Sequence, residues 1–366
     1  MNRFARLGLA LLGCVAASQG QEQAYRVRPG ESIQAALDLA ARDPVIKRVI
    51  VQAGVYRPET NRLALLWLNA RHDGIHLEAD GDVTLSAANP AISDPKRKGH
   101  PAVVNHVIYI GDGISTNTVV KGFKITGANN FVLLDHARQI EPNNQLPVGL
   151  YFFTDGGGVK IFGRSYPTLE NLEIFDSFSS PCAGGISIEH CGEKSGPAGA
   201  VEIRNCIFRG ARARETGSAL DLLWGSSARV RNCLFVGNIS NTEAGQRGQF
   251  TNNGALTVFP DSHIVVENCT FTGNRNGVDD MSSGNRYVNS IFWENTLDAG
   301  LPGARYELAL ADGSGVVGCV IHGPVPDLNK TLPAGKNRSP AGPPDFSTDF
   351  TPRSPGYEEI GYRPGR

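Results

Sequence analysis

Residues 232–238 read Asn-Cys-Leu-Phe-Val-Gly-Asn and residues 268–274 read Asn-Cys-Thr-Phe-Thr-Gly-Asn, so two distant segments share five residues in one pattern. Further segments keep this register, with Asn or Gly in first place and apolar or aromatic residues two positions before it and three after it. The reference residues are Gly122, Asn171, Asn205, Asn232, Asn268, Asn289 and Gly318. They are separated by 21 to 49 residues. Such spacing indicates a fold built from stacked repeats.

Each reference residue divides two short alternating segments that are out of phase with one another. Alternation with a period of two predicts a strand, so each repeat has one strand before the Asn or Gly and a second strand beyond a sharp bend. Asn tolerates the backbone of such a bend, and its amide can hydrogen-bond to the Asn of the next repeat.

A third strand, often introduced by glycine, precedes each pair. We expect these strands at 156–161, 184–188, 218–222, 254–258 and 276–280. The shortest separation of 21 residues fits one turn of three strands, and the longer ones predict insertions at a single corner. The sequence therefore predicts an all-β, single-domain, right-handed parallel β-helix with three strands per coil.

The two ends of the chain depart from the repeat. Residues 1–20 combine early positive charge with an uncharged apolar run, which predicts a signal peptide and export. Residues 11–14 (Leu-Leu-Gly-Cys) also resemble a bacterial lipobox, so a lipid anchor at Cys14 is the alternative to plain secretion. An amphipathic segment at 32–41 predicts a helical cap. The proline-rich residues 326–366 predict an irregular tail that lies along the last coil or caps it.

Two motifs carry a family resemblance. The glycine-led strand followed by Pro-Thr-Leu-Glu-Asn at 167–171, and the Asn-Cys-x-Phe-x-Gly-Asn pattern, resemble the pectin-lyase-like superfamily of exported bacterial β-helix proteins. The resemblance covers about residues 25–325 and implies the fold, but no single activity, because the superfamily includes lyases, hydrolases, epimerases, adhesins and phage tailspikes. Of the polygalacturonase signatures only Asp279-Asp280 is present, and the Asp-Pro-His-Asp motif of alginate epimerases is missing. Both activities are therefore disfavoured.

Composition narrows the class of protein further. With 19% charged and 40% hydrophobic residues the chain is too apolar to be disordered, and with 43 glycines it is too glycine-rich for a helical bundle. A net charge of −1 gives no global basic field, so we expect no nucleic-acid partner. No segment after the first twenty residues is long and apolar enough to predict a membrane span.

The cysteines divide into two groups. Cys206, Cys233, Cys269 and Cys319 share one inward repeat position, which predicts a buried ladder of stacked thiols. Cys182 and Cys191 flank a glycine-led strand, and a local disulfide between them is left open. The sequence has no Cys-x-x-Cys pair or Cys/His cluster, so it predicts no metal site and names no cofactor; a bound Ca²⁺ ion is left open.

The glycine-led strands align so that one outward row holds Lys160, Ser187, Asp221, Thr257 and Asp279. Glu189 and Phe259 lie two residues beyond that row on their strands, and Trp224 follows Asp221 by three. Such a face suits a sugar chain, with rings against Phe259 or Trp224 and hydroxyls against carboxylates such as Glu189. The alternative is that these residues are polar only because they meet water.

Two chemistries fit this face. In a hydrolase, Asp221 and Asp279 lie two coils apart, which is roughly 10 Å at about 4.8 Å per coil. Their carboxylates could then reach the roughly 6.5–9.5 Å separation of an inverting glycosidase. The alternative is a solvated pair of aspartates without a chemical role.

In a lyase, a cation neutralises the uronate carboxylate and a base removes the proton beside it. Arg212 and Arg214 precede Asp221 and are the candidate cations, while Lys160 or His190 is the candidate base. The alternative is that the arginines of this stretch, including Arg204, Arg229 and Arg231, lie on another strand face and only keep the surface soluble.

We therefore expect an exported polysaccharide lyase or glycoside hydrolase, with its site around Asp221 and a polysaccharide as its partner. A non-catalytic glycan-binding or adhesin-like surface protein is the alternative. The two differ in whether Lys160, Glu189, Asp221 and Asp279 line one groove walled by the insertions at 131–155 and 239–253.

Overall fold

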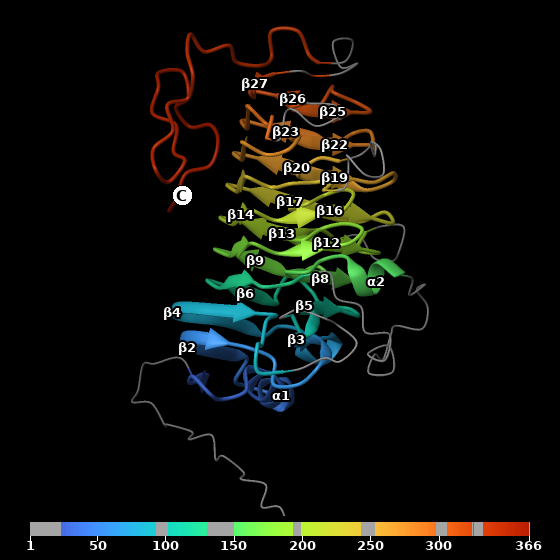
Figure 1. Cartoon of the computed structure of the whole chain (residues 1–366), viewed down its shortest axis with the longest axis vertical. Coiled ribbons are helices and arrows are strands. Elements are labelled where there is room, and N and C mark those ends of the chain that lie inside the picture. Colours follow the sequence, from blue (N-terminus) through green and yellow to red (C-terminus); the bar gives the residue numbers. More distant parts are fainter. Residues whose placement is uncertain are drawn as a thin grey trace, which may run out of the picture.

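The computed structural model describes residues 23–92, 102–129, 150–192, 199–242, 253–297, 306–323, 325 and 332–365. Within these ranges the protein is all-β, with its strands stacked one above another along the long axis of the molecule (Figure 1). The residues of the expected signal peptide, including Cys14, lie outside the described part of the chain. No helix among the described residues is long and apolar enough to cross a membrane.

One sheet has eight strands joined by parallel ladders, and it contains all the predicted glycine-led strands. In chain order its strands are β3 (Arg62–Leu68), β5 (Val104–Gly111), β8 (Val159–Phe162), β12 (Ile186–Glu189), β16 (Leu220–Leu223), β19 (Leu256–Val258), β22 (Val278–Asp280) and β25 (Leu308–Leu310).

The second sheet has seventeen strands, also in parallel ladders. The strands that precede the reference residues, with the long strands of the N-terminal end, are β1 (Tyr25–Val27), β2 (Arg48–Tyr56), β4 (His76–Ser86), β6 (Val119–Lys121), β9 (Thr168–Glu170), β13 (Val201–Arg204), β17 (Ser227–Arg231), β20 (His263–Glu267), β23 (Arg286–Val288) and β26 (Val316–Val317). Those that follow are β7 (Lys124–Thr126), β10 (Glu173–Phe175), β14 (Ile207–Arg209), β18 (Leu234–Val236), β21 (Thr270–Thr272), β24 (Ile291–Trp293) and β27 (Val320–His322).

Each repeat therefore passes once through the eight-stranded sheet and twice through the seventeen-stranded sheet, as the sequence predicts. A small third sheet pairs β11 (Phe178–Ser179) with β15 (Arg212–Ala213). The apolar residues of all these strands meet between the sheets in one continuous core.

The bend between the paired strands confirms the role of the reference residues. Asn171, Asn205, Asn232, Asn268 and Asn289 all have a left-handed backbone, with φ between 48° and 56°. Asn is among the few residues other than Gly that adopt this conformation readily, and Gly122 and Gly318 take its place in the other repeats with φ of 85° and 71°. The Asn232 amide also donates to Asn205 Oδ1 at 2.8 Å, which is one rung of the expected amide stacking.

The predicted thiol ladder is present. Cys206, Cys233 and Cys269 are fully buried, and the backbone N–H of each of the first two donates to the sulfur of the next at 3.4 Å. Ser290 continues the row by accepting from the Cys269 N–H at 3.1 Å. Cys182 and Cys191 are free thiols, so the structure contains no disulfide between them.

The N-terminal helix α1 (Ile33–Arg42) begins one residue later than predicted. Ser32 is its N-cap and accepts from the Ala35 N–H at 3.2 Å. The predicted apolar face is buried, and the helix lies at the bottom end of the stack next to β1, β2 and β3 (Figure 1). Two shorter helical segments are η1 (Ala70–His72) and α2 (Leu150–Thr154).

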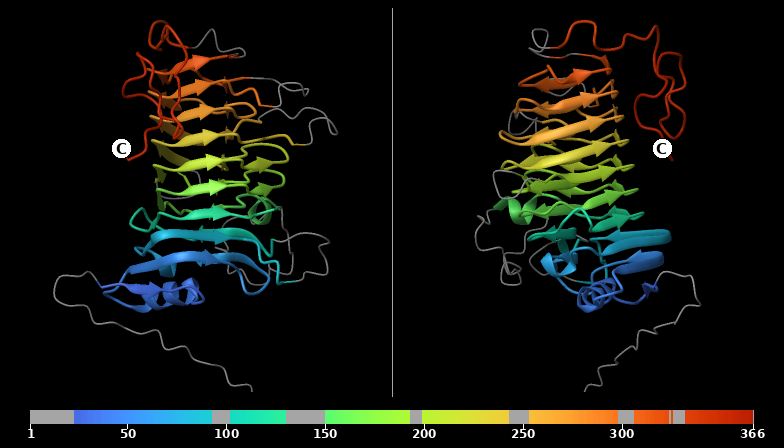
Figure 2. Two further views of the ribbon diagram at one scale, coloured as in Figure 1. Left: turned by 60° about the vertical axis from the view of Figure 1, so that its left-hand side comes forward. Right: turned by 180° about the vertical axis from the view of Figure 1, so that it is seen from behind.

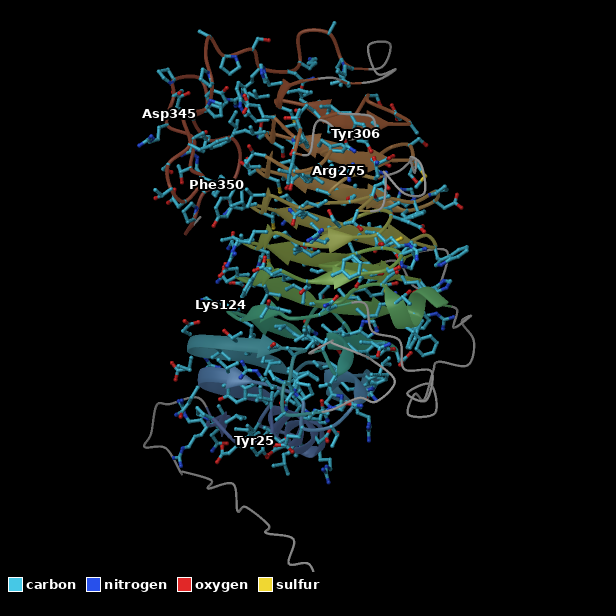
Figure 3. The ribbon with its side chains drawn as sticks, viewed as in Figure 1. Tyr25, Lys124, Arg275, Tyr306, Asp345 and Phe350 are labelled. Carbon is cyan, nitrogen blue, oxygen red and sulfur yellow. The ribbon has the colours of Figure 1, made fainter. Side chains whose placement is uncertain are left out.

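The C-terminal tail has no helix or strand within residues 332–365, which confirms the predicted irregular structure. Residues 336–338 hydrogen-bond to the last repeat of the stack, and the tail then runs down one side of the stack (Figure 2). Tyr357 and Ile360 pack on Ile291 and Val320, and Asn232 exchanges two hydrogen bonds of 2.8 Å with the backbone of Arg363. Asp345 and Phe350 mark this tail in Figure 3, on the opposite side of the stack from Tyr306.

Candidate functional site

The predicted row of side chains is present on the eight-stranded sheet, but these side chains are not exposed to solvent. The register pairs Lys160 with Ser187, Ser187 with Asp221, Asp221 with Thr257, and Thr257 with Asp279. Asp279 is 7% exposed and the other four are fully buried, so the expectation of a solvent-facing row is wrong.

The chain itself covers this row, because the segment before each strand folds back over the sheet. A Cβ atom on Gly217 would lie 2.5 Å from Cβ of Asp221, and one on Gly156 would lie 3.1 Å from Cβ of Ser187. Both glycines also have a left-handed backbone, so only glycine permits this close approach. Gly156, one of the glycines that predicted the strands, and Gly217, which precedes a predicted strand, therefore help to cover the row.

Lys160 and Glu189 form a buried ion pair at the centre of this face. The ammonium Nζ donates to Glu189 Oε2 at 2.6 Å and to the Ser187 hydroxyl at 3.1 Å. Burial alone would favour the neutral amine, but the carboxylates of Glu189 and Asp155 outweigh it and raise the pKa of Lys160. A lysine held in its charged form is a poor general base, which argues against the predicted catalytic role of Lys160.

Beside this pair lie two further acids and a thiol, from Asp155, Cys182 and Asp221. Each offers one donor atom within 4.8 Å of the other two. Burial raises the pKa of Asp155 to about 7, against the opposing charge of Lys160. Burial also raises the pKa of Asp221 well above its usual range, and the Asp155 carboxylate adds to this effect. Asp221 is thus inside a closed charged cluster, and not an open carboxylate as predicted.

Asp155 and Cys182 were not predicted as site residues from the sequence; Cys182 was considered only for a disulfide with Cys191. Both stand just before the glycines of a glycine-led strand, in Asp155-Gly-Gly-Gly and Cys182-Ala-Gly-Gly. This shared position was the available signal, because parallel strands bring equivalent positions of neighbouring repeats together.

Asp279 lies on the same face but in separate surroundings. It is two strands from Asp221, with Thr257 between them, as the predicted spacing requires. Its Oδ2 accepts from the hydroxyl of Tyr306 at 3.0 Å, and Tyr306 lies beside Asn253 (Figure 3). Since both aspartates are buried, the structure does not present them as an open hydrolytic pair.

The exposed part of the site is at the end of β16, where Trp224 lies beside the buried His190, which follows β12. Their rings stack with centroids 5.9 Å apart and planes at 11°, and the buried ring of Phe162 lies nearly perpendicular to His190 with centroids 5.6 Å apart. Trp224 is 54% exposed, whereas His190 is 8% exposed. The ring of Trp224, backed by His190, offers a flat apolar platform to a ligand.

His190 also contacts the buried charges. Its Nε2 lies 3.8 Å from Glu189 Oε1, so the ring connects the exposed Trp224 to the Lys160–Glu189 pair. Burial lowers the pKa of His190, against the carboxylate of Glu189. The imidazole is therefore neutral at pH 7 and can accept a proton.

The remaining predicted residues do not join this site. Arg212 and Arg214 precede Asp221 at the opposite end of β16 from Trp224, and Arg214 pairs with Glu215 at 3.0 Å. Phe259 follows β19 and is half-buried. The predicted cluster of Asp221, Arg212, Arg214 and Trp224 is therefore not assembled around one point.

The neighbouring arginines lie on another strand face, as the alternative interpretation of the sequence proposed. Arg204 and Arg229 are exposed on the seventeen-stranded sheet and pair across repeats with Glu170 and Glu202. Such surface ion pairs contribute about 0–1 kcal/mol each to folding stability. These arginines therefore belong to the solvent-exposed surface of that sheet and not to the candidate site.

The residues predicted to line the groove, Lys160, Glu189, Asp221 and Asp279, are buried. Most of the insertions predicted to wall it, at 131–155 and 239–253, lies outside the described residues. A hollow of about 150 Å³ is present elsewhere, lined in part by Gln34, Arg62 and Trp67 near α1. Comparison of the chain with protein families, characterised proteins and solved structures finds no match to any of them.

Proposed function

We propose that this chain is a right-handed parallel β-helix capped by α1 and exported through its first twenty residues. The parallel ladders, the three strands of each repeat and the left-handed Asn bends support this fold. The resemblance to the pectin-lyase-like superfamily, carried by the glycine-led strands and the Asn-Cys motif, supports a place outside the cell, where a lipid anchor at Cys14 is the alternative to free secretion.

We further propose that the protein is a polysaccharide lyase acting on a uronate-containing chain. The stacked pair of His190 and Trp224 at the end of β12 and β16 is the observation that carries this proposal. A sugar ring packs on the exposed face of Trp224, which places its neighbouring uronate beside the neutral imidazole of His190.

In this reaction His190 removes the proton on the carbon next to the uronate carboxylate. The electron pair of that C–H bond forms a carbon–carbon double bond, and the glycosidic oxygen leaves with the electrons of its C–O bond and takes a proton from water. Glu189 stabilises the imidazolium that forms, because Oε1 lies 3.8 Å from Nε2. The backbone N–H of Arg164 donates to the His190 carbonyl at 2.8 Å, which holds this residue next to His190, and we place its guanidinium against the uronate carboxylate.

Elimination is favoured over hydrolysis because of what lies beside the exposed Trp224. Hydrolysis needs two carboxyl groups that face one bond, and Asp221 and Asp279 are buried in separate surroundings away from Trp224, whereas His190 stacks on that ring. His190 is a base that can act without a second acid at the same point.

The test is to incubate the purified protein with uronate and neutral polysaccharides while following both reducing ends and the ultraviolet absorbance of an unsaturated uronate. A joint rise on a uronate polymer supports elimination. Reducing ends without the absorbance would show hydrolysis and contradict the proposal. The matched variants are His190→Gln and His263→Gln, since His263 is exposed and lies on the other sheet, in β20.

A second candidate function is non-catalytic glycan binding, which the full burial of the acid cluster favours. A binder would be retained on an immobilised polysaccharide through Trp224 without producing new ends. Retention with no turnover on any uronate polymer would therefore select this candidate.

A further inference from the structure

The cluster of Asp155, Cys182 and Asp221 has the properties of a ligand set and has no part in the proposed elimination. Its three donor atoms come from the segments before β8, before β12 and within β16. They lie within 4.8 Å of one another, and each of the three side chains is at most 3% exposed.

Among the described residues, three buried carboxylate oxygens of this cluster have no partner at hydrogen-bonding distance. They are Oδ2 of Asp155 and both carboxylate oxygens of Asp221. Leaving a buried polar group without a partner costs about 1–3 kcal/mol, and more for a charged one, so unpaired oxygens concentrated at one point call for a ligand.

The surrounding hydrogen bonds hold these side chains in place. Asp155 Oδ1 accepts from the Cys182 N–H at 3.1 Å and from the Thr154 hydroxyl at 3.2 Å, whereas Oδ2 has no partner among the described residues. The Thr216 hydroxyl donates to the sulfur of Cys182 at 3.1 Å. Ligand side chains of metal sites are commonly held in this way by an outer set of hydrogen bonds.

The local charge also favours a cation. The carboxyl groups of Asp155, Asp221 and Glu189 share this buried region with the ammonium of Lys160, which lies on Glu189 at 2.6 Å. A buried carboxyl group is stable when it is paired, protonated or bound to a metal. A divalent cation between the two aspartates would replace their protons and balance the charge of their carboxylates.

We propose that Asp155, Cys182 and Asp221 bind a zinc ion. Zinc accepts thiolate and carboxylate ligands together, whereas calcium and magnesium take oxygen ligands. Donor atoms at zinc distances of about 2.0–2.3 Å lie roughly 3.5 Å apart in a tetrahedron, and the three donor atoms, which lie within 4.8 Å of one another, need to approach by at most about 1.3 Å on binding. Three protein ligands leave a fourth position for water. This site has no local sequence motif such as Cys-x-x-Cys, because its three ligands come from three successive repeats.

The test is to measure metal binding, so it does not depend on any enzymatic activity. The purified full chain is stripped with a chelator, dialysed against Zn²⁺ or Co²⁺, and analysed for metal content and thermal midpoint. We expect one zinc per chain, a higher midpoint with zinc, and a thiolate-to-cobalt charge-transfer band with Co²⁺. Cys182→Ser and Asp221→Asn should each weaken zinc binding at least tenfold, and Cys182→Ser should abolish the charge-transfer band.

The matched control is Cys191→Ser, another buried free thiol that lies after β12 and should leave the band and the stoichiometry unchanged. Circular dichroism of each variant checks that the fold is intact. If a variant is unfolded, the cobalt spectrum of the unaltered chain decides by itself. Absence of the band and of bound zinc, or stabilisation by Ca²⁺ but not by Zn²⁺, would overturn the proposal. A zinc-binding protein without lyase activity would refute only the proposed function.

Discussion

The rings of His190 and Trp224 lie parallel because their residues occupy equivalent positions of neighbouring repeats. Each follows the last residue of its strand, β12 or β16, and each has a left-handed backbone with φ of 56°. The His190 N–H donates to the Leu223 carbonyl, so the two strand ends are held in register. The repeat therefore builds the platform, and only the side chains at these two positions make it specific.

Removing the exposed ring should weaken binding of the polysaccharide. We expect Trp224→Ala to lower affinity about tenfold, because a ring stacked on a ligand is worth about 0.5–1.5 kcal/mol beyond its buried area. The thermal midpoint should stay unchanged, since Trp224 is 54% exposed. The measurement is affinity electrophoresis or calorimetry with the polymer that the activity screen identifies.

Trp293→Ala is the matched control, because Trp293 also stacks on a histidine, His322, with centroids 4.2 Å apart, but on the other sheet. Equal losses in the two variants would mean that the Trp224 platform is not the binding surface.

The rate of elimination should depend on pH through His190. Burial lowers the pKa of His190 below the usual value of 6.5. The neutral imidazole therefore predominates at any pH above this lowered pKa. We expect kcat/KM to rise with pH through that point and then to level off. His190→Gln should lose about 10²–10⁴-fold in kcat and this acidic limb. An acidic limb that persists in an active His190→Gln variant would assign the base to another group.

The repeat made most of the fold predictable. Because Asn at a left-handed bend and alternating apolar residues have few other uses, the pattern around Asn232 and Asn268 was enough to place the paired strands and the thiol ladder. The alignment of Lys160 with Asp221 followed from the same register, since parallel strands pair equivalent positions.

The burial of the row that contains Lys160 and Asp221 could not be predicted from the repeat pattern. Alternation tells which side chains leave the core, but not that the segment carrying Gly217 turns back over Asp221. The cluster of Asp155 and Cys182 depends on this turn as well, because both residues belong to the covering segments. Local pattern therefore determined the register, whereas the chemistry of the site depends on contacts between repeats.

A row of hydrogen-bonded, buried Asn side chains ends at the carboxyl group of Glu307. This carboxyl group should make the free energy of unfolding depend on pH. The Asn274 amide donates to Asn295 Oδ1 at 2.7 Å, and the Asn295 amide donates to Glu307. Burial raises the pKa of Glu307 from 4.5 to about 7. Between these values the folded chain holds a proton that the unfolded chain has lost, so Glu307 makes stability fall as pH rises from about 4.5 to about 7.

Glu307→Gln removes this titration. We expect its free energy of unfolding, relative to the unaltered chain, to increase by on the order of 3 kcal/mol between pH 4.5 and pH 8. Urea unfolding at several pH values measures the difference. Identical pH dependence in the two chains would show that Glu307 is ionised throughout.

The thiol ladder should tolerate serine better than alanine. Cys233 is fully buried, its sulfur accepts from the Cys206 N–H, and Ser290 occupies the equivalent position two repeats later. Cys233→Ser keeps an acceptor and should cost about 1 kcal/mol or less, whereas Cys233→Ala leaves the N–H unpaired and should cost about 1–3 kcal/mol. Guanidinium unfolding gives both values. A smaller loss for alanine than for serine would mean that these N–H···S contacts contribute little to stability.

The C-terminal tail should detach as a unit before the sheets unfold. Its contacts with the stack include the packing of Tyr357 and Ile360, hydrogen bonds near Arg363, and hydrogen bonds of residues 336–338 to the last repeat. Tyr357→Ala removes a fully buried ring, which would cost about 3–5 kcal/mol in a core by analogy with Phe and Trp. Because the tail has no strand of its own, we expect this cost to appear as local opening. Limited proteolysis should then cut the variant faster within 332–365 while its β-sheet circular dichroism is unchanged.

The matched control is Lys336→Ala, at an exposed residue of the same tail, which should be cut at the original rate. Cleavage of Tyr357→Ala at the original rate would show that the tail is held by other contacts.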